Sequence, residues 1–377
     1  MKNRQEDLEL YVHIPFCVRK CSYCDFLSFS AGKERQEQYV QALLKEIKSV
    51  NKKISGRVSS VFVGGGTPSV LAPAQTERIF AALRENFIFA PNAEITMEAN
   101  PGTLDREKLA AYRRAGINRL SLGLQSPQDA ELKALGRIHS FREFQDNFFL
   151  AREAGFSNIN VDLMFAIPGQ TRESWAENLR TVAQLGPEHI SAYSLIIEEG
   201  TPFATQELDL PDEDTEYAMY EDTAQLLGTY GYGQYEISNY AKEGFACCHN
   251  IGYWQRVNYL GLGLGASSLL DNQRFSNTRS MEKYLRLSGS PSEIRCMEPT
   301  LTREDAMGEF MFLGLRMSRG VSRVEFERKF GCSMEFVYGE ILEKYFGLGL
   351  LAEEGQQVFL TRSGIHVSNA VMADFLL

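Results

Sequence analysis

The stretch LELYVHIPFCVRKCSYC, residues 8–24, places three closely spaced cysteines directly after a run of apolar residues. Residues 8–13 have the pattern of a buried β-strand, and the loop that follows them contains Cys17, Cys21 and Cys24. Three thiols within eight residues indicate metal chemistry rather than packing. We therefore predict a first strand that delivers a metal-binding loop at its carboxyl end.

Strands and helices alternate in the chain beyond this stretch. We predict further strands at residues 60–63, 94–99, 119–123, 158–165 and 189–196. We predict helices at residues 34–50, 72–86, 105–115, 141–154, 172–185 and 212–230. A β-α unit repeated about six times requires a parallel sheet with helices outside it. Six units are too few for a complete eight-fold barrel, so the predicted fold is α/β, an open, partial TIM-like (β/α)6 barrel.

The last third of the chain has a different pattern. Residues 241–300 are less regular, rich in glycine and aromatic residues, with one predicted helix at 281–288. From residue 301 we predict three helices, two short strands and a final helix that begins at residue 361. The predicted organisation is a core at 1–240, a connecting segment at 241–300, and a small winged-helix-like α+β module at 301–377.

Composition excludes several classes of protein. A hydrophobic fraction of 44% supplies a large core, which excludes a disordered chain. The formal charge of −10 excludes an overall basic surface, so we expect no stable nucleic-acid complex. The longest apolar runs are interrupted by glycine and are too short to span a bilayer, and the charged residues 1–10 are not a secretory signal. We therefore predict a cytoplasmic protein with reduced cysteines.

The three cysteines suit a four-iron cluster. Three thiolates fill three irons of a 4Fe-4S cube and leave one iron open to a reactant, whereas a structural metal site is closed. The alternatives are a zinc site or three packing cysteines. Zinc usually needs a fourth ligand, for which His13 is the candidate.

The spacing Cys17-x3-Cys21-x2-Cys24 resembles that of radical S-adenosylmethionine (SAM) enzymes. In that family the open iron binds the amino and carboxylate groups of SAM, and one electron passed to the sulfonium yields a 5′-deoxyadenosyl radical. The resemblance implies a 4Fe-4S cluster on these three cysteines and SAM as a second cofactor.

Polar residues at other predicted strand ends can complete a SAM pocket. The GGGTP loop at residues 64–68 allows close backbone approach to a ligand, and Glu98 can hold an ammonium or a ribose. Gln125 ends the fourth strand, and Arg137 can pair with a carboxylate. Asp162 lies in an otherwise apolar strand, and because a buried, unpaired carboxylate is costly, a ribose hydroxyl would serve as its partner.

The order of these strings resembles one subfamily over nearly the whole chain, the oxygen-independent coproporphyrinogen III oxidases and the related HemW-type heme chaperones. The resemblance implies SAM contacts at Tyr11, Tyr23, Gly65, Gly66, Thr67, Glu98, Gln125, Arg137 and Asp162.

Two features separate the two branches. The oxidase has a further cysteine two residues after the third ligand, where this sequence has Phe26, and a longer N-terminal arm, where only ten residues precede Tyr11. Both differences disfavour coproporphyrinogen III oxidation and leave open whether the protein is an enzyme.

The string HNIGYW, residues 249–254, resembles the HNxxYW motif of the chaperone branch, with His249 as the heme ligand. An imidazole suits heme iron, and aromatic rings suit a porphyrin face. The alternative is a packed loop with His249 bonded to backbone, preceded by Cys247 and Cys248 as small buried residues.

The resemblance therefore implies a heme chaperone that transfers heme to a recipient hemoprotein. Its expected partners are heme or a porphyrin, the recipient, an electron donor, and peripheral membrane contact through the recipient. The alternative is an oxidase that converts coproporphyrinogen III to protoporphyrinogen IX. A third possibility is another radical SAM activity.

Overall fold

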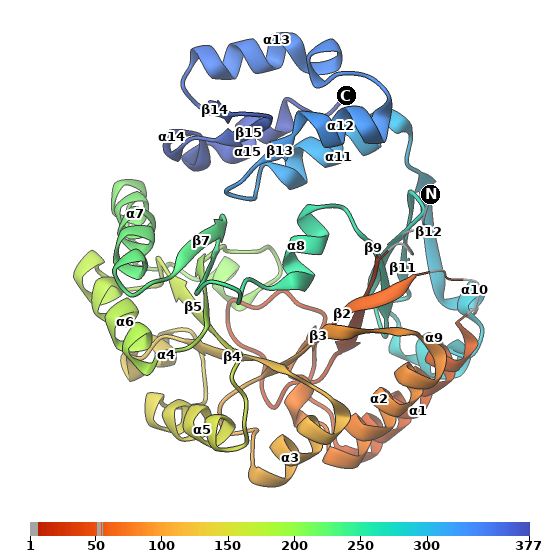
Figure 1. Ribbon diagram of the computed structural model, residues 1–377. Helices are drawn as coiled ribbons and strands as arrows, with labels where there is room; N and C mark the ends of the chain where they lie inside the picture. Colours follow the sequence, from red (N-terminus) through yellow and green to blue (C-terminus); the bar gives the residue numbers. More distant parts are fainter. Residues whose placement is uncertain (1–6, 51–53, 55) are drawn as a thin grey trace.

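Six parallel strands form the centre of the computed structural model, which describes residues 7–50, 54 and 56–377 (Figure 1). They are β1 (Asp7–Ile14), β2 (Arg57–Gly65), β3 (Phe89–Ala99), β4 (Arg119–Gln125), β5 (Ile159–Phe165) and β6 (His189–Ser194). Each strand pairs in parallel with the next one along the chain. The six predicted strands are confirmed, although β2 and β3 begin earlier than predicted and the last one ends at Ser194, two residues earlier than predicted.

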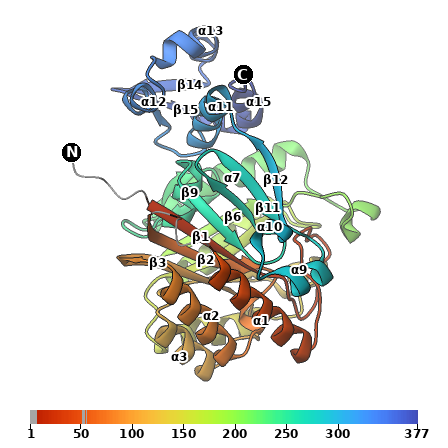
Figure 2. The same ribbon diagram turned by 90° about the vertical axis from the view of Figure 1, so that its right-hand side faces the viewer.

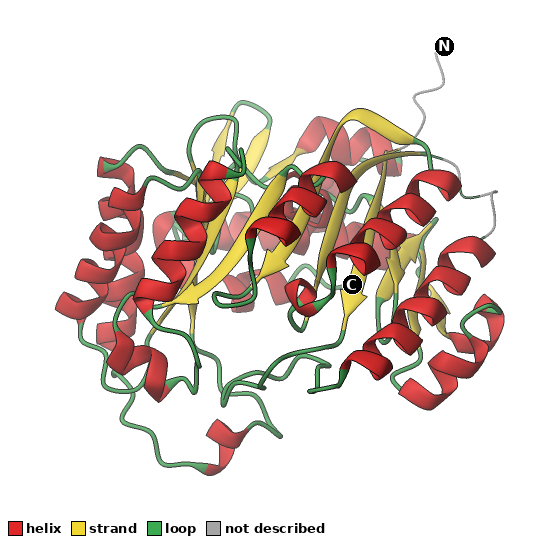
Figure 3. Ribbon diagram, turned by 90° about the horizontal axis from the view of Figure 1, so that it is seen from below, coloured by secondary structure: helices red, strands yellow, loops and turns green. Residues whose placement is uncertain are grey.

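Helices cover the outer side of these strands (Figure 3). They are α1 (Lys33–Ser49), α2 (Pro73–Asn86), α3 (Arg106–Ala115), α5 (Phe141–Glu153), α6 (Arg172–Leu185) and α7 (Glu213–Thr229). All six were predicted, and their polar N-caps explain where several begin: the Asp105 carboxylate accepts from the Lys108 amide, and Ser140 forms a capping box with Glu143. The short helices α4 (Asp129–Ala134), η1 (Pro68–Val70) and η2 (Pro202–Thr205) were not predicted.

Additional strands extend both edges of the sheet without closing it. On the β1 side lie β9 (Asn258–Leu262), β10 (Ser267–Leu270), β11 (Gln273–Asn277) and β12 (Arg295–Thr300), and beyond β6 lie β8 (Asn239–Ala241) and β7 (Gly233–Glu236). Over the described residues the strand order ends in β12 and β7, so the sheet is an open, partial barrel. Four of these strands come from the predicted connecting segment. The domain boundaries themselves stay a prediction.

The C-terminal residues form a second, smaller layer that stands at one end of the sheet (Figures 1 and 2). It contains α11 (Arg303–Gly314), β13 (Val321–Ser322), α12 (Arg323–Phe330), α13 (Met334–Gly347), β14 (Leu351–Glu354), β15 (Gln357–Leu360), α14 (Arg362–His366) and α15 (Ser368–Ala373). The strands form an antiparallel sheet in the order β13-β15-β14, and buried side chains such as Met311, Phe326 and Tyr338 form a separate apolar core. The single final helix that we predicted is wrong, because Val367 interrupts it with non-helical backbone angles.

Three short helices connect the edge strands. They are α8 (Cys248–Trp254), between β8 and β9, and α9 (Met281–Leu287) and α10 (Pro291–Ile294), both between β11 and β12. Helix α8 contacts both β2 and α11, so it lies between the barrel and the C-terminal layer. Among the described residues, no helix combines the length and apolar character needed to cross a bilayer.

Candidate cluster and cofactor site

The three-cysteine loop follows β1 and is tied down at its base. The Cys17 amide donates to the Phe29 carbonyl at 3.1 Å, and the Phe29 amide donates to Pro15 at 3.0 Å. All three cysteines are half-buried, free thiols. The Thr67 hydroxyl lies 3.5 Å from the Cys17 sulfur, and the Arg137 guanidinium lies 3.6 Å from the Cys21 sulfur. Half-buried thiols beside a hydroxyl and a cation suit a thiolate-bound cluster, because these donors stabilise negative charge on sulfur.

Arg137 links the cysteine loop to the strand ends. Its Nη2 donates to the Asn100 side-chain oxygen at 2.8 Å and to the Gly123 carbonyl at 2.5 Å. The Asn100 amide nitrogen in turn donates to the Thr67 hydroxyl at 2.8 Å. Asn100 therefore connects the donors of two cluster thiols, a role that we missed although the residue follows Glu98 by two positions.

The glycine loop after β2 packs tightly against the cysteine loop. Gly65 has a φ of +113°, and a Cβ there would lie 2.4 Å from the His13 ring. A Cβ on Gly66 would lie 2.6 Å from the Phe16 carbonyl oxygen. Packing alone therefore favours glycine at both positions, and their approach to a ligand stays a prediction.

His13 is not free to act as a zinc ligand. Its Nε2 bonds the Leu27 carbonyl at 2.9 Å, and its Nδ1 bonds the Tyr11 hydroxyl at 3.0 Å. Both ring nitrogens of His13, the fourth ligand that the zinc alternative needs, are therefore already hydrogen-bonded within the protein.

Glu98 and Asp162 bring two carboxyl groups into the barrel at the same end. Glu98 accepts from the Gly65 amide at 3.1 Å, and burial together with the Asp162 charge raises its pKa to about 8. Asp162 accepts from the Ser121 hydroxyl at 3.1 Å and from the Asn160 amide at 2.7 Å. Asp162 therefore has two protein donors, Ser121 of β4 and Asn160 of its own strand, so it does not depend on a ligand for a partner, and its contact with SAM stays a prediction.

The predicted SAM residues gather at the carboxyl ends of β1 to β5. Gln125 ends β4 with a φ of +74°, at a register shift between β4 and β5, which marks strained backbone. Tyr23 packs in a small apolar cluster with Leu135, Ile167 and Phe203. Burial raises the pKa of Tyr11, which keeps its hydroxyl protonated. The structure thus brings together residues from five strands and their loops.

His249 lies at the other end of the barrel. Its ring is 1% exposed, its Nδ1 bonds the Ser60 hydroxyl at 2.7 Å, and it stacks on Phe62 with ring centres 5.3 Å apart. The alternative of a backbone bond is therefore wrong, because the partner is a side chain. Ser60 lies near the start of β2, five residues or about 16 Å of strand from Gly65. The HNxxYW segment and the cysteine loop are thus at opposite ends of the barrel.

Two buried carboxyl groups hold α8 in place. Glu94 of β3 accepts from the Cys248 and His249 amides at 3.1 and 3.2 Å, so it caps the start of the helix. Glu9 of β1 approaches His249 Nδ1 at 3.8 Å, and a Cβ on Gly252 would lie 2.0 Å from its carboxyl oxygen. Burial raises the pKa of Glu9 to about 9 and lowers the pKa of His249 to about 3, so both are neutral at pH 7.

Sequence reasoning missed Glu94, although a charge inside a predicted strand was the signal that we used for Asp162. The same signal points to Arg119, which is 1% exposed within β4. The predicted burial is confirmed for Cys247 and wrong for Cys248, which is exposed.

The partial barrel with a three-cysteine loop at its carboxyl ends defines the radical SAM superfamily, whose family model matches residues 11–182. The HemN C-terminal domain model matches residues 301–367. The solved structure of coproporphyrinogen III oxidase (HemN) from Escherichia coli, described as a radical SAM enzyme, is similar with a TM-score of 0.87 and 26% identity, covering 99% of this chain and 90% of that one.

Curated relatives narrow the class further. The heme chaperone HemW of Lactococcus lactis is 37% identical over 99% of this chain and 98% of its own length. The heme chaperone HemW of Escherichia coli is also 37% identical, over 98% of each chain. The chain belongs to the HemW heme chaperone family. Membership of the radical SAM superfamily makes a 4Fe-4S cluster and SAM its cofactors.

Proposed function

We propose that this protein is a radical-SAM-type heme chaperone that binds heme and transfers it to a recipient hemoprotein. The observation that carries the proposal is full-length similarity to HemW chaperones, joined to a three-cysteine loop at the carboxyl ends of the barrel strands. An electron donor, a cytoplasmic location and peripheral membrane contact through the recipient are parts of the same proposal.

Cys17, Cys21 and Cys24 would hold three irons of the cluster and leave the fourth for SAM. When bound, the cluster supplies the single electron that cleaves the sulfonium. The chain's own contribution is to orient the thiols: Thr67 and Arg137 donate toward two of the sulfurs, and Asn100 holds both donors. The residues present therefore fit the cluster.

The SAM pocket would use the predicted residues at the carboxyl ends of β1 to β5. They are Tyr11, Tyr23, Gly65, Gly66, Thr67, Glu98, Gln125, Arg137 and Asp162. Glu98 is the group whose charge state matters most, because an ammonium needs an ionised partner.

We expect SAM binding to strengthen as pH rises. Since the pKa of Glu98 is about 8 without ligand, most of its carboxyl is protonated at pH 7, and the neutral form does not pair with an ammonium. Affinity should therefore rise by roughly fiftyfold between about pH 6 and pH 8, as the ionised fraction of Glu98 rises from about 1% to about 50%, and Glu98→Gln should bind weakly with no such rise. Calorimetric titration of SAM into reconstituted protein measures both. Glu107→Gln, a change at an exposed residue, serves as the control. If the affinity of Glu98→Gln for SAM still rises with pH as in the unmodified protein, the assignment is contradicted.

His249 is our proposed axial heme ligand, under a condition that the structure sets. Its Nε2 is buried without a partner, so this nitrogen is available to iron. Yet the ring lies inside the barrel beneath α8, between Phe62 and Tyr253. Ligation therefore requires α8 to move away from Glu9 and Glu94.

An anaerobic assay that offers hemin and coproporphyrinogen III together tests the function. We expect a Soret band from bound heme, no protoporphyrinogen IX, and transfer of the heme to an apo-hemoprotein. His249→Ala should shift or weaken the band, and an unchanged spectrum would exclude His249 as the ligand. Conversion of coproporphyrinogen would instead establish the oxidase, to which the HemN-like fold is equally suited.

A further inference from the structure

A groove of about 780 Å³ separates the end of α8 from the C-terminal layer. One wall is the turn from Trp254 to Asn258, which joins α8 to β9. The other wall belongs to α11 and α12 and includes Phe310, Lys329 and Phe330. Its volume is within the ~300–1,000 Å³ of typical small-molecule sites. His249 is not among its lining residues, whereas Trp254, the last residue of the HNxxYW motif, is.

Basic residues gather on the wall formed by the C-terminal layer. Arg319, Arg328 and Lys329 all line the groove, in a chain whose net charge is −10. Three acidic residues also line it: Asp7, Asp271 and Glu325. Burial lowers the pKa of Lys329 and the nearby Glu325 raises it, while Arg256 and Arg328 lower it, so these three cations lie close enough to repel one another although one carboxylate is also near. An anionic ligand would relieve that repulsion.

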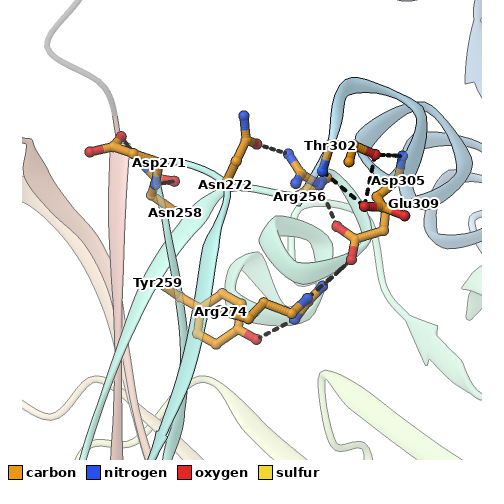
Figure 4. Close-up of polar contacts among 9 residues, drawn as sticks. All are labelled: Arg256, Asn258, Tyr259, Asp271, Asn272, Arg274, Thr302, Asp305 and Glu309. Atoms are coloured by element: carbon orange, nitrogen blue, oxygen red, sulfur yellow. Dashed lines mark hydrogen bonds and ion pairs between the residues drawn. The ribbon is translucent and has the colours of Figure 1, made fainter. Parts of the chain in front are cut away.

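Arg256 is already neutralised, so it does not count among the free cations. Its Nε donates to Glu309 at 2.5 Å, and Arg274 donates to the other oxygen of the same carboxylate at 2.8 Å (Figure 4). Glu309 lies on α11, and the two arginines lie at the edge of the barrel. This contact holds the two walls of the groove together.

Aromatic side chains supply flat apolar surface beside the cations. The guanidinium of Arg316 lies 4.5 Å from the centre of the Trp254 ring, and the Lys329 ammonium lies 5.3 Å from the centre of the Phe310 ring. The indole nitrogen of Trp254 is buried without a hydrogen-bond partner. Aromatic rings beside cations suit a flat aromatic ligand that carries carboxylates at one edge.

We propose that this groove binds the porphyrin of heme, with the ring against Trp254 and the two propionates on Arg319, Arg328 and Lys329. The inference rests on the proposed function and assigns the heme a binding surface that needs no bond to iron. It also explains how heme can be held while His249 is still enclosed in the barrel.

Iron-free protoporphyrin IX is the probe that isolates this surface, because it has the ring and the propionates but offers no iron to His249. We expect the full-length protein to quench its fluorescence on binding. The double variant Arg328→Glu/Lys329→Glu should weaken binding by about tenfold or more, since charge-assisted hydrogen bonds to both propionates are lost. Protoporphyrin dimethyl ester should bind the unmodified protein more weakly by a similar factor.

The matched control is Lys48→Glu/Arg142→Glu, which makes the same charge change at exposed positions on α1 and α5. This control should bind protoporphyrin as the unmodified protein does, and thermal unfolding should show that every variant folds. If the groove variant still binds heme and its affinity for protoporphyrin is unaltered, the inference is overturned and the proposed function is not. Failure of the unmodified protein to bind either heme or protoporphyrin would overturn the proposed function with it.

Discussion

Replacing Cys17, Cys21 and Cys24 together by alanine should leave the reconstituted protein without bound iron or sulfide and without SAM cleavage. The reason is that these thiols are the cluster's only protein ligands in the proposed site. Each single replacement should also remove most of the cluster, because a cube held by two thiolates has lost a third of its anchoring bonds.

Iron and sulfide analysis after anaerobic reconstitution measures this, together with the electron paramagnetic resonance signal of the reduced cluster and the release of 5′-deoxyadenosine. The matched controls are Cys296→Ala and Cys332→Ala, which lie on β12 and after α12 and should keep the full cluster. Stoichiometric iron and sulfide in the triple variant would contradict the assignment. A single tetrahedral zinc in the unmodified protein would do the same.

Glu309→Gln should lower the free energy of unfolding by about 3 kcal/mol, near the loss typical of breaking a buried ion pair. The Glu309 side chain is only 11% exposed, and it bonds Arg256, which is 13% exposed, and Arg274, which is 26% exposed. A neutral amide leaves two poorly hydrated guanidinium groups beside each other without a counter-charge. Because Glu309 joins α11 to the barrel edge, the C-terminal layer should also loosen (Figure 4).

Urea unfolding followed by circular dichroism measures the stability, and protease cleavage between the barrel and α11 reports the loosening. Glu304→Gln, an exposed residue on the same helix, is the control and should change the stability by less than about 0.5 kcal/mol. An unchanged urea midpoint in Glu309→Gln would show that solvent already compensates the two arginines. Weaker protoporphyrin binding in the same variant would be consistent with the groove, since Glu309 holds its walls together.

The long elements of the barrel could be predicted because their apolar periodicity extends over many residues. All six central strands and their covering helices have such patterns. The edge strands β7 to β12 and helix α8 were missed because they are three to seven residues long and contain glycine and polar residues. These short strands gain their structure from pairing with β1, with β6 or with one another, which no local pattern records.

The cysteine loop and the glycine loop needed only local spacing to be recognised, since their chemistry depends on residues that are close along the chain. The bond from Ser121 to Asp162 and the enclosure of His249 depend instead on residues from other strands. Ser60 and His249 are 189 positions apart, yet their side chains are 2.7 Å from each other. Contacts of this kind arise only when the sheet curves and α8 packs against it, so burial and distance inside the barrel follow from the assembled fold.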